Sequence, residues 1–160
     1  MSDDDVSGDD MDDGESGESG PVDFVSLLPH RPPFRFVDAV DSVVPGERAV
    51  ARYRVTGDEA FLAGHFPGNP VFPGVIQLEA LAQAGAVAVL ADPRFRQRLP
   101  LFGGVERARF RRIVRPGDEL VLAVELERLS ARGGWGQGRA TIGGVGGPLA
   151  CEARLLFAFA

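Results

Sequence analysis

The stretch that decides the fold is Gly64–Gln83, GHFPGNPVFPGVIQLEALAQ. It begins as a loop rich in glycine and proline. After Pro73 it continues into an apolar run over 74–90 whose only polar side chains are Gln77, Glu79 and Gln83. Apolar residues fall on every face of a helix built from this run, which indicates a helix buried on most sides. A membrane span is the competing interpretation, and the many alanines, the carboxylate and the two amides disfavour it.

The segments around this helix are predicted to be strands. Residues 47–55 and 119–129 alternate apolar and polar side chains with the period of a half-exposed strand. Turns rich in Gly and Pro separate four more predicted strands, over 34–44, 101–113, 135–142 and 149–159. Two short helices are expected, over 22–28 and 58–62. A helix that is apolar on nearly every side needs a surface that encloses it. We therefore predict an α+β protein with the hot-dog fold, in which a curved antiparallel sheet wraps around one long central helix, and a dimer that pairs the edge strands.

Charge divides the chain into two parts. Residues 1–20 hold nine Asp or Glu and no Arg, which leaves 14 of the 23 acids and all 17 arginines in the rest. Because 1–20 has almost no apolar content, it cannot bury enough surface to offset its ordering entropy. We predict a disordered acidic tail over 1–20 and a single hot-dog domain over 21–160. The mildly basic domain suits an acidic partner.

The cysteine and histidine content limits the chemistry. The single cysteine, Cys151, excludes an intrachain disulfide and a multi-cysteine metal site, and it fits a reducing compartment. No secretory signal is visible, so we expect a cytoplasmic protein that does not span a membrane. Two histidines and no ligand pair at metal spacing predict no metal, and no glycine-rich phosphate loop follows a strand, so we expect no cofactor.

Three groups in the central segment suit proton transfer beside a carbonyl group. His65 lies in a stiff loop, where a structural, hydrogen-bonded histidine is the alternative. Gly74 begins the expected helix, whose free N–H groups and positive dipole end can bind a carbonyl oxygen or an oxyanion. Glu79 lies among apolar residues, which should raise its pKa and let it act as a general acid; an exposed position on a surface stripe is the alternative. Such a set suits removal of a proton α to a carbonyl with loss of a β-hydroxyl, and also the reverse hydration.

At these residues the chain resembles the β-hydroxyacyl-acyl-carrier-protein dehydratases of fatty-acid synthesis, in their broad-specificity branch. The likeness extends over roughly 27–157. It includes LLPHR at 27–31, PF at 33–34, VD at 37–38, ARF at 108–110, and PGD at 116–118. Two features depart from the family pattern. Pro100 and Leu101 stand where tyrosines are common, one of which gates the acyl tunnel, and the acidic tail is longer than usual.

The resemblance implies a cofactor-free lyase that converts a β-hydroxyacyl thioester on acyl carrier protein to the trans-2-enoyl thioester. It implies that His65 and Glu79 are the catalytic pair, contributed by different protomers of a dimer that often forms a trimer of dimers. The predicted substrate-binding residues are Gly74, whose N–H polarises the thioester carbonyl, Gln83, Phe66 and Val75. The related isomerase branch usually has Asp in place of Glu79, which favours plain dehydration. One alternative is the same chemistry in a specialised polyketide or lipid pathway. The other is a non-catalytic acyl-binding or structural subunit on the same fold.

Two further features have alternative interpretations. A run of arginines is either a solvated face or a docking surface for the acidic carrier protein. Strand alternation should place its odd-numbered members on one face. The predicted docking residues are Arg107, Arg109, Arg111 and Arg112. Nucleic-acid binding is not expected, because the net charge is small and no recognition motif accompanies the arginines. His30, in the opening motif, is expected to make a structural hydrogen bond rather than to take part in catalysis.

Overall fold

A computed structural model describes residues 22–160, so the predicted disorder of 1–20 lies outside the described residues and stays a prediction. The elements are, in chain order, the short 3-10 helix η1 (Phe24–Leu27), β1 (Ala39–Val44), β2 (Arg48–Arg54), the 3-10 helix η2 (Ala60–Ala63), α1 (Gly74–Ala91), β3 (Pro100–Phe110), β4 (Glu119–Ser130), β5 (Gly133–Ile142) and β6 (Leu149–Phe159). The long helix and the two short helices lie where the sequence predicts them.

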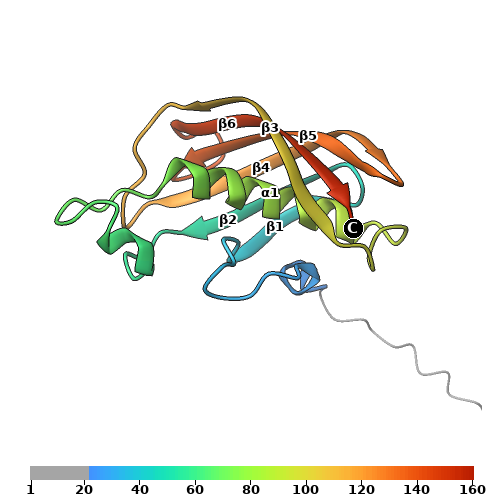
Figure 1. Cartoon of the computed structure of the whole chain (residues 1–160), viewed down its shortest axis with the longest axis horizontal. Helices are drawn as coiled ribbons and strands as arrows, with labels where there is room; N and C mark the ends of the chain where they lie inside the picture. The colour runs from blue at the N-terminus through green and yellow to red at the C-terminus, as the bar shows by residue number, and fades with distance from the viewer. Residues whose placement is uncertain (1–21) are drawn as a thin grey trace, which may run out of the picture.

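The six strands form one antiparallel sheet in the order β1-β2-β4-β5-β6-β3, and this sheet curves around α1 (Figure 1). Thirteen of the 18 residues of α1 are buried. Small side chains allow this close approach: a Cβ on Gly85 would lie 3.2 Å from Val124 of β4. The helix is long and apolar enough to cross a membrane, but it is the core helix of this domain. The predicted hot-dog fold is confirmed.

Two strands are shorter than predicted, because their ends bond elsewhere. The first begins at Ala39 rather than at residue 34, since the backbone of Phe34 and Phe36 bonds to the side chain of Gln83 on α1. The strand β3 ends at Phe110 rather than at residue 113. Beyond it, the carbonyl of Val114 accepts a hydrogen bond from Phe72, which ties the chain after β3 to the loop that precedes α1.

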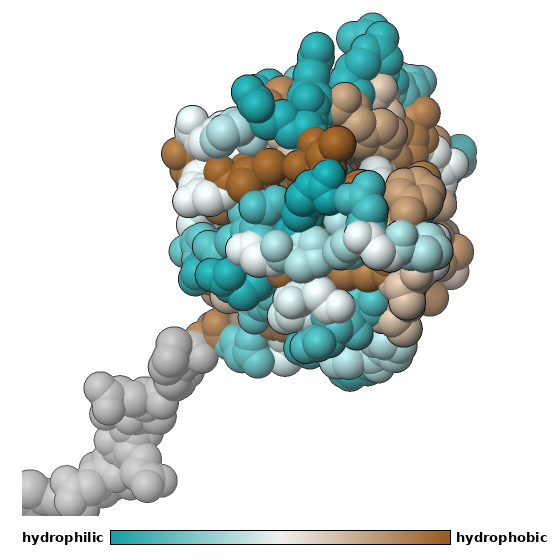
Figure 2. Space-filling view, turned by 90° about the vertical axis from the view of Figure 1, so that its left-hand side faces the viewer, coloured by the Kyte–Doolittle hydropathy of each residue, from teal (hydrophilic) through white to brown (hydrophobic). Residues whose placement is uncertain are grey.

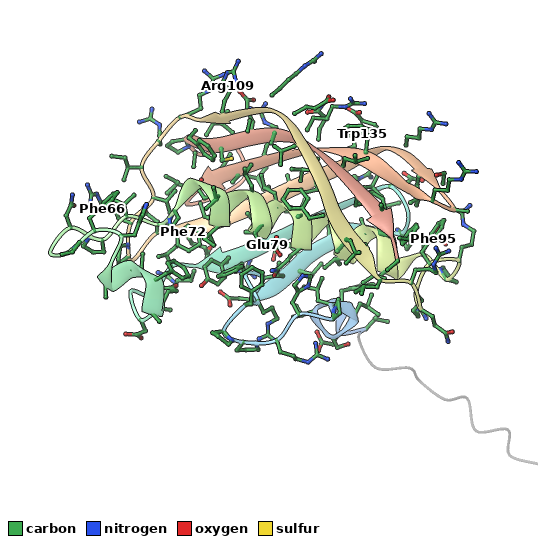
Figure 3. All side chains as sticks on the ribbon, in the orientation of Figure 1. Phe66, Phe72, Glu79, Phe95, Arg109 and Trp135 are labelled. Atoms are coloured by element: carbon green, nitrogen blue, oxygen red, sulfur yellow. The ribbon has the colours of Figure 1, made fainter. Side chains whose placement is uncertain are left out.

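An aromatic cluster anchors that loop to the sheet. Phe72 is 1 % exposed, and its ring centroid lies 5.7 Å from Tyr53 of β2, 5.8 Å from Phe61 of η2 and 6.4 Å from Phe36. Offset and edge-to-face aromatic pairs at these separations are favourable. The cluster therefore holds the loop 64–73 at one end of α1, where Figure 3 shows Phe66 and Phe72.

Candidate active site

Glu79 is held by side chains and by the segment that precedes β1. Residues four apart share a helix face, so α1 places Glu79 beside Gln83. The Nε2 of Gln83 donates to Glu79 Oε1 at 2.9 Å and to the carbonyl of Phe34 at 3.1 Å. The Oε1 of Gln83 accepts from the N–H of Phe36 at 2.7 Å. Gln83 is fully buried and the Glu79 side chain is 17 % exposed, so the carboxyl group is largely enclosed, as the sequence predicts.

His30 lies beside this carboxyl group, although the two residues are far apart in the sequence. Its Nε2 is 3.5 Å from Glu79 Oε1. The expected structural hydrogen bond of the His30 side chain is not found among residues 22–160, and its buried Nδ1 has no partner there. No local pattern reveals this proximity, because it depends on the bonds from Gln83 to Phe34 and Phe36.

A small cavity of about 50 Å³ lies next to Glu79. Its polar lining is His30, Glu79 and Gln83, and the rest is mostly apolar. The lining comes from α1, from the start of β3, and from β4, β5 and β6, and includes Ala82, Ala86, Val89, Leu101, Phe102, Leu126 and Leu155. A mostly apolar cavity whose few polar groups lie together suits an alkyl chain that carries one polar function.

His65 lies in a separate, open hollow of about 470 Å³ at the N-terminal end of α1. Its Nδ1 is 2.7 Å from the carbonyl of Val71, so Nδ1 carries a proton and Nε2 is left as an acceptor. The ring stacks on Phe66, with centroids 4.2 Å apart. A neutral imidazole held in this way can take a proton from a bound ligand.

Gly74 lines the same hollow. The N–H groups of Ile76 and Gln77 both bond to the carbonyl of Pro73, whereas Gly74 N–H donates no backbone hydrogen bond within the described chain. A Cβ on Gly74 would lie 2.7 Å from the ring of Phe110, so only glycine fits here without a shift of that ring. A free N–H at a helix N-terminus is suited to a carbonyl oxygen.

The two halves of the predicted site do not meet within one chain. His65 and Gly74 line one hollow and Glu79 lines the other, and no residue is common to the two linings. Figure 3 shows Phe66, the neighbour of His65, in the loop at one end of the molecule and Glu79 near the middle of α1. One described chain therefore carries two half-sites.

The rim of the His65 hollow is apolar and exposed. Val75 is 68 % exposed, and Phe110 and Ile113, which line the hollow with it, are exposed as well. Phe66 does not line the hollow, but it stacks on His65 and is 51 % exposed. Figure 2 looks at this end of the molecule and shows hydrophobic surface among the hydrophilic residues. Several exposed apolar side chains close together are consistent with a site of interaction.

Three of the four predicted docking arginines, Arg107, Arg109 and Arg111, lie near Glu152 on the outer face of the sheet. A bulge between Glu106 and Arg109 interrupts β3 where Arg107 adopts a left-handed backbone conformation (φ 54°). Arg107 and Arg109 both line a groove on the outer face of the sheet, and Figure 3 shows Arg109 there. Arg111 and Arg112 lie beyond the strand and line the His65 hollow.

Arg111 also forms an ion pair with Glu152. The distance from Arg111 Nη2 to Glu152 Oε1 is 2.7 Å. The hydrogen bond from Arg111 lowers the pKa of the Glu152 carboxyl group. Within residues 22–160, no group of three or more His, Cys, Asp or Glu side chains is placed to hold a metal ion.

The chain matches known proteins over most of its length. Residues 28–153 match the family model described as the FabA-like domain. The chain is 53 % identical over 136 residues to the 3-hydroxyacyl-(acyl-carrier-protein) dehydratase FabZ of Chloroflexus aggregans, which covers 85 % of this chain and 92 % of that protein. It is 55 % identical over 132 residues to the protein of the same name from Moorella thermoacetica, with 82 % and 90 % covered.

Solved structures share the fold at low sequence identity. The dehydratase heterocomplex ApeI:P of Xenorhabdus doucetiae aligns with a TM-score of 0.69 and 19 % identity over 88 % of this chain and 92 % of that one. The PaaI protein of E. coli aligns with a TM-score of 0.59 and 16 % identity, with 78 % and 79 % covered.

Proposed function

The chain belongs to the FabA-like family and, within it, to the 3-hydroxyacyl-(acyl-carrier-protein) dehydratases, and from this premise we propose how its own residues carry out the reaction. The enzyme is a hydro-lyase that removes water from a 3-hydroxyacyl thioester on acyl carrier protein in fatty-acid synthesis. The observation that carries the proposal is the pair of half-sites, one with a fixed imidazole and one with an enclosed carboxyl group.

The base is His65 and the acid is Glu79. The thioester carbonyl accepts a hydrogen bond from Gly74 N–H, which stabilises the negative charge that develops on this oxygen as C2 loses its proton. The free Nε2 of His65 takes the proton from C2, and the electrons of that C–H bond form the C2–C3 double bond as the C3–O bond breaks. Glu79 gives its proton to the departing hydroxyl, which leaves as water. The products are the enoyl thioester, protonated His65 and the Glu79 carboxylate, and proton transfer through solvent restores both groups.

A second copy of the chain completes the site. The strand β3 is at the edge of the sheet, since β6 is its only partner among the strands of residues 22–160. Three of its apolar side chains are exposed in the single chain, namely Leu101 (49 %), Phe102 (42 %) and Val105 (40 %), and the first two also line the Glu79 cavity. An exposed apolar edge strand favours pairing with another chain.

The direction of that pairing supports a shared site. The start of β3, Pro100–Phe102, lines the Glu79 cavity, and its end, Phe110, lines the His65 hollow. If two copies of β3 pair antiparallel about a two-fold axis, the start of one strand lies opposite the end of the other. The His65 hollow of one protomer then faces the Glu79 cavity of its partner. We propose this homodimer as the working unit, and a trimer of dimers as its larger assembly.

The carrier protein reaches the site from the arginine-bearing side. Arg112 lies in the His65 hollow, and Arg107 and Arg109 line the groove on the outer face of the sheet. These cations suit an acidic carrier, which they attract over a long range and hold weakly.

The lone cysteine is a buried free thiol, which supports the proposed cytoplasmic location.

Two variants test the assignment. His65→Ala and Glu79→Gln should each lose at least about 100-fold in kcat, because proton transfer by a positioned group contributes about that much or more. The assay measures the enoyl product formed from carrier-bound 3-hydroxyacyl substrates, and gel filtration of each variant checks its assembly. Near-normal turnover by either variant contradicts the assignment. Binding of acyl carrier protein by the unaltered chain without any turnover would instead support the non-catalytic alternative.

A further inference from the structure

We infer that His30 is a positioning residue for the acid Glu79: together with Gln83 it fixes which carboxyl oxygen carries the proton. The inference rests on the proposed function, in which Glu79 protonates the departing hydroxyl. It starts from the position of Nε2 of His30, 3.5 Å from Glu79 Oε1 at the edge of the enclosed cavity.

The proton of the His30 ring belongs on Nε2. Its Nδ1 is buried and has no hydrogen-bond partner among the described residues. A proton on Nδ1 would be a buried donor without an acceptor, an arrangement that is rare in native structures, whereas an unpaired acceptor is better tolerated. With the proton on Nε2, the ring points its donor at Glu79.

Both donors converge on one carboxyl oxygen. Glu79 Oε1 receives the hydrogen bond from Gln83 Nε2 at 2.9 Å, and His30 Nε2 approaches the same atom. Because both donors face Oε1, that oxygen must act as an acceptor, and the acidic proton is placed on the other carboxyl oxygen, Oε2. No hydrogen bond to Oε2 is found within residues 22–160, which leaves its proton available to the substrate hydroxyl.

The distance of 3.5 Å is at the outer limit of a hydrogen bond. Contacts of catalytic groups are often long in the empty enzyme and tighten when substrate binds. The segment that carries His30 is held close by two bonds from Gln83 to Phe34 and Phe36, so only a small shift is required.

Amide side chains of different length test this role. The amide nitrogen of Gln can reach the place of the histidine Nε2, whereas that of Asn reaches the place of Nδ1. We expect His30→Ala and His30→Asn to lower kcat roughly 10-fold or more with KM within about threefold, because orientation of a reacting group affects the chemical step. His30→Gln should retain kcat within about threefold of the unaltered enzyme. Ser26→Ala, on the exposed surface of η1 in the same segment as His30, is the matched control.

A purely structural role for His30 predicts a different pattern. In that case His30→Asn and His30→Gln would lower the melting temperature alike, and their kcat values would not differ from each other. Equal kcat for His30→Gln and His30→Asn therefore overturns the inference, whether both variants are active or both are impaired. The pair remains informative even if His30→Ala does not fold.

A double-mutant cycle separates this inference from the proposed function. If His30 acts through Glu79, then adding His30→Ala to Glu79→Gln should cause no further loss of kcat, since the group to be positioned is already absent. Full activity of Glu79→Gln would contradict the proposed acid. An inactive Glu79→Gln with a fully active His30→Ala would contradict only the role of His30.

Discussion

Replacing Gln83 with leucine should weaken both the fold and the reaction, because one buried side chain serves both. Leucine has a similar volume, so the change removes three hydrogen bonds without leaving a large cavity. The N–H of Phe36, a residue that is 1 % exposed, is then left without its acceptor, which costs about 1–3 kcal/mol. Phe34 is 51 % exposed, so its carbonyl can turn to water at little cost.

The expected loss for Gln83→Leu is therefore about 2 kcal/mol, or roughly 4–8 °C in melting temperature for a chain of this size. The kcat should fall roughly 10- to 100-fold, because the Glu79 carboxyl group loses its strongest anchor. Thermal unfolding followed by circular dichroism and steady-state kinetics measure the two effects.

The matched control is Gln137→Leu on β5, where an exposed glutamine bonds only to Glu127. Its stability should change by no more than about 0.5 kcal/mol. If Gln83→Leu unfolds and turns over like Gln137→Leu, the reasoning is refuted.

Three further predictions concern assembly, acid stability and thiol reactivity. Val105→Arg, on the exposed edge strand β3, should give an inactive monomer by light scattering; a dimer of normal size would remove β3 as the interface. Burial acts to raise the pKa of Glu59, but hydrogen bonds from its own backbone and from Thr56, Tyr53 and Gly57 outweigh it and hold the pKa below its usual value. The stability advantage over Glu59→Gln should therefore be complete above the unfolded pKa of about 4.3 and shrink as the pH falls through the lower folded pKa; a pH-independent difference in denaturant unfolding contradicts this. Burial raises the pKa of the Cys151 thiol to about 11, so a thiol reagent at pH 8 should label it only in denaturant, and rapid labelling of the folded protein would show that the site opens.

Sequence reasoning found the fold because its two signals are local and strong. The apolar run after Pro73 predicts a helix that needs enclosure, and the period-two segments supply the enclosing sheet. The predicted strand ends differ from the observed ones in two places. Near Phe36 the backbone bonds to a side chain, and after Phe110 the chain leaves the sheet. Neither event leaves a periodic trace in the sequence.

The site was predicted in its parts but not in its arrangement. His65, Gly74 and Glu79 stand out because their residue types are unusual in their local setting. The proximity of His30 to Glu79 was not predictable, because it depends on bonds from Gln83 to residues 47 and 49 positions away in the chain. The bulge at Arg107 also escaped prediction, since it arises from the register between β3 and β6.

The central claim is that each site takes its base from one protomer and its acid from the other, and mixing two inactive variants tests it most directly. His65→Ala and Glu79→Gln chains, refolded together in equal amounts, should form mixed dimers in which one of the two sites has both groups intact. Random pairing makes half of the dimers mixed, so about a quarter of the normal activity should return. Activity that stays at the level of the separate variants, although mass spectrometry finds the mixed dimer, would contradict the account.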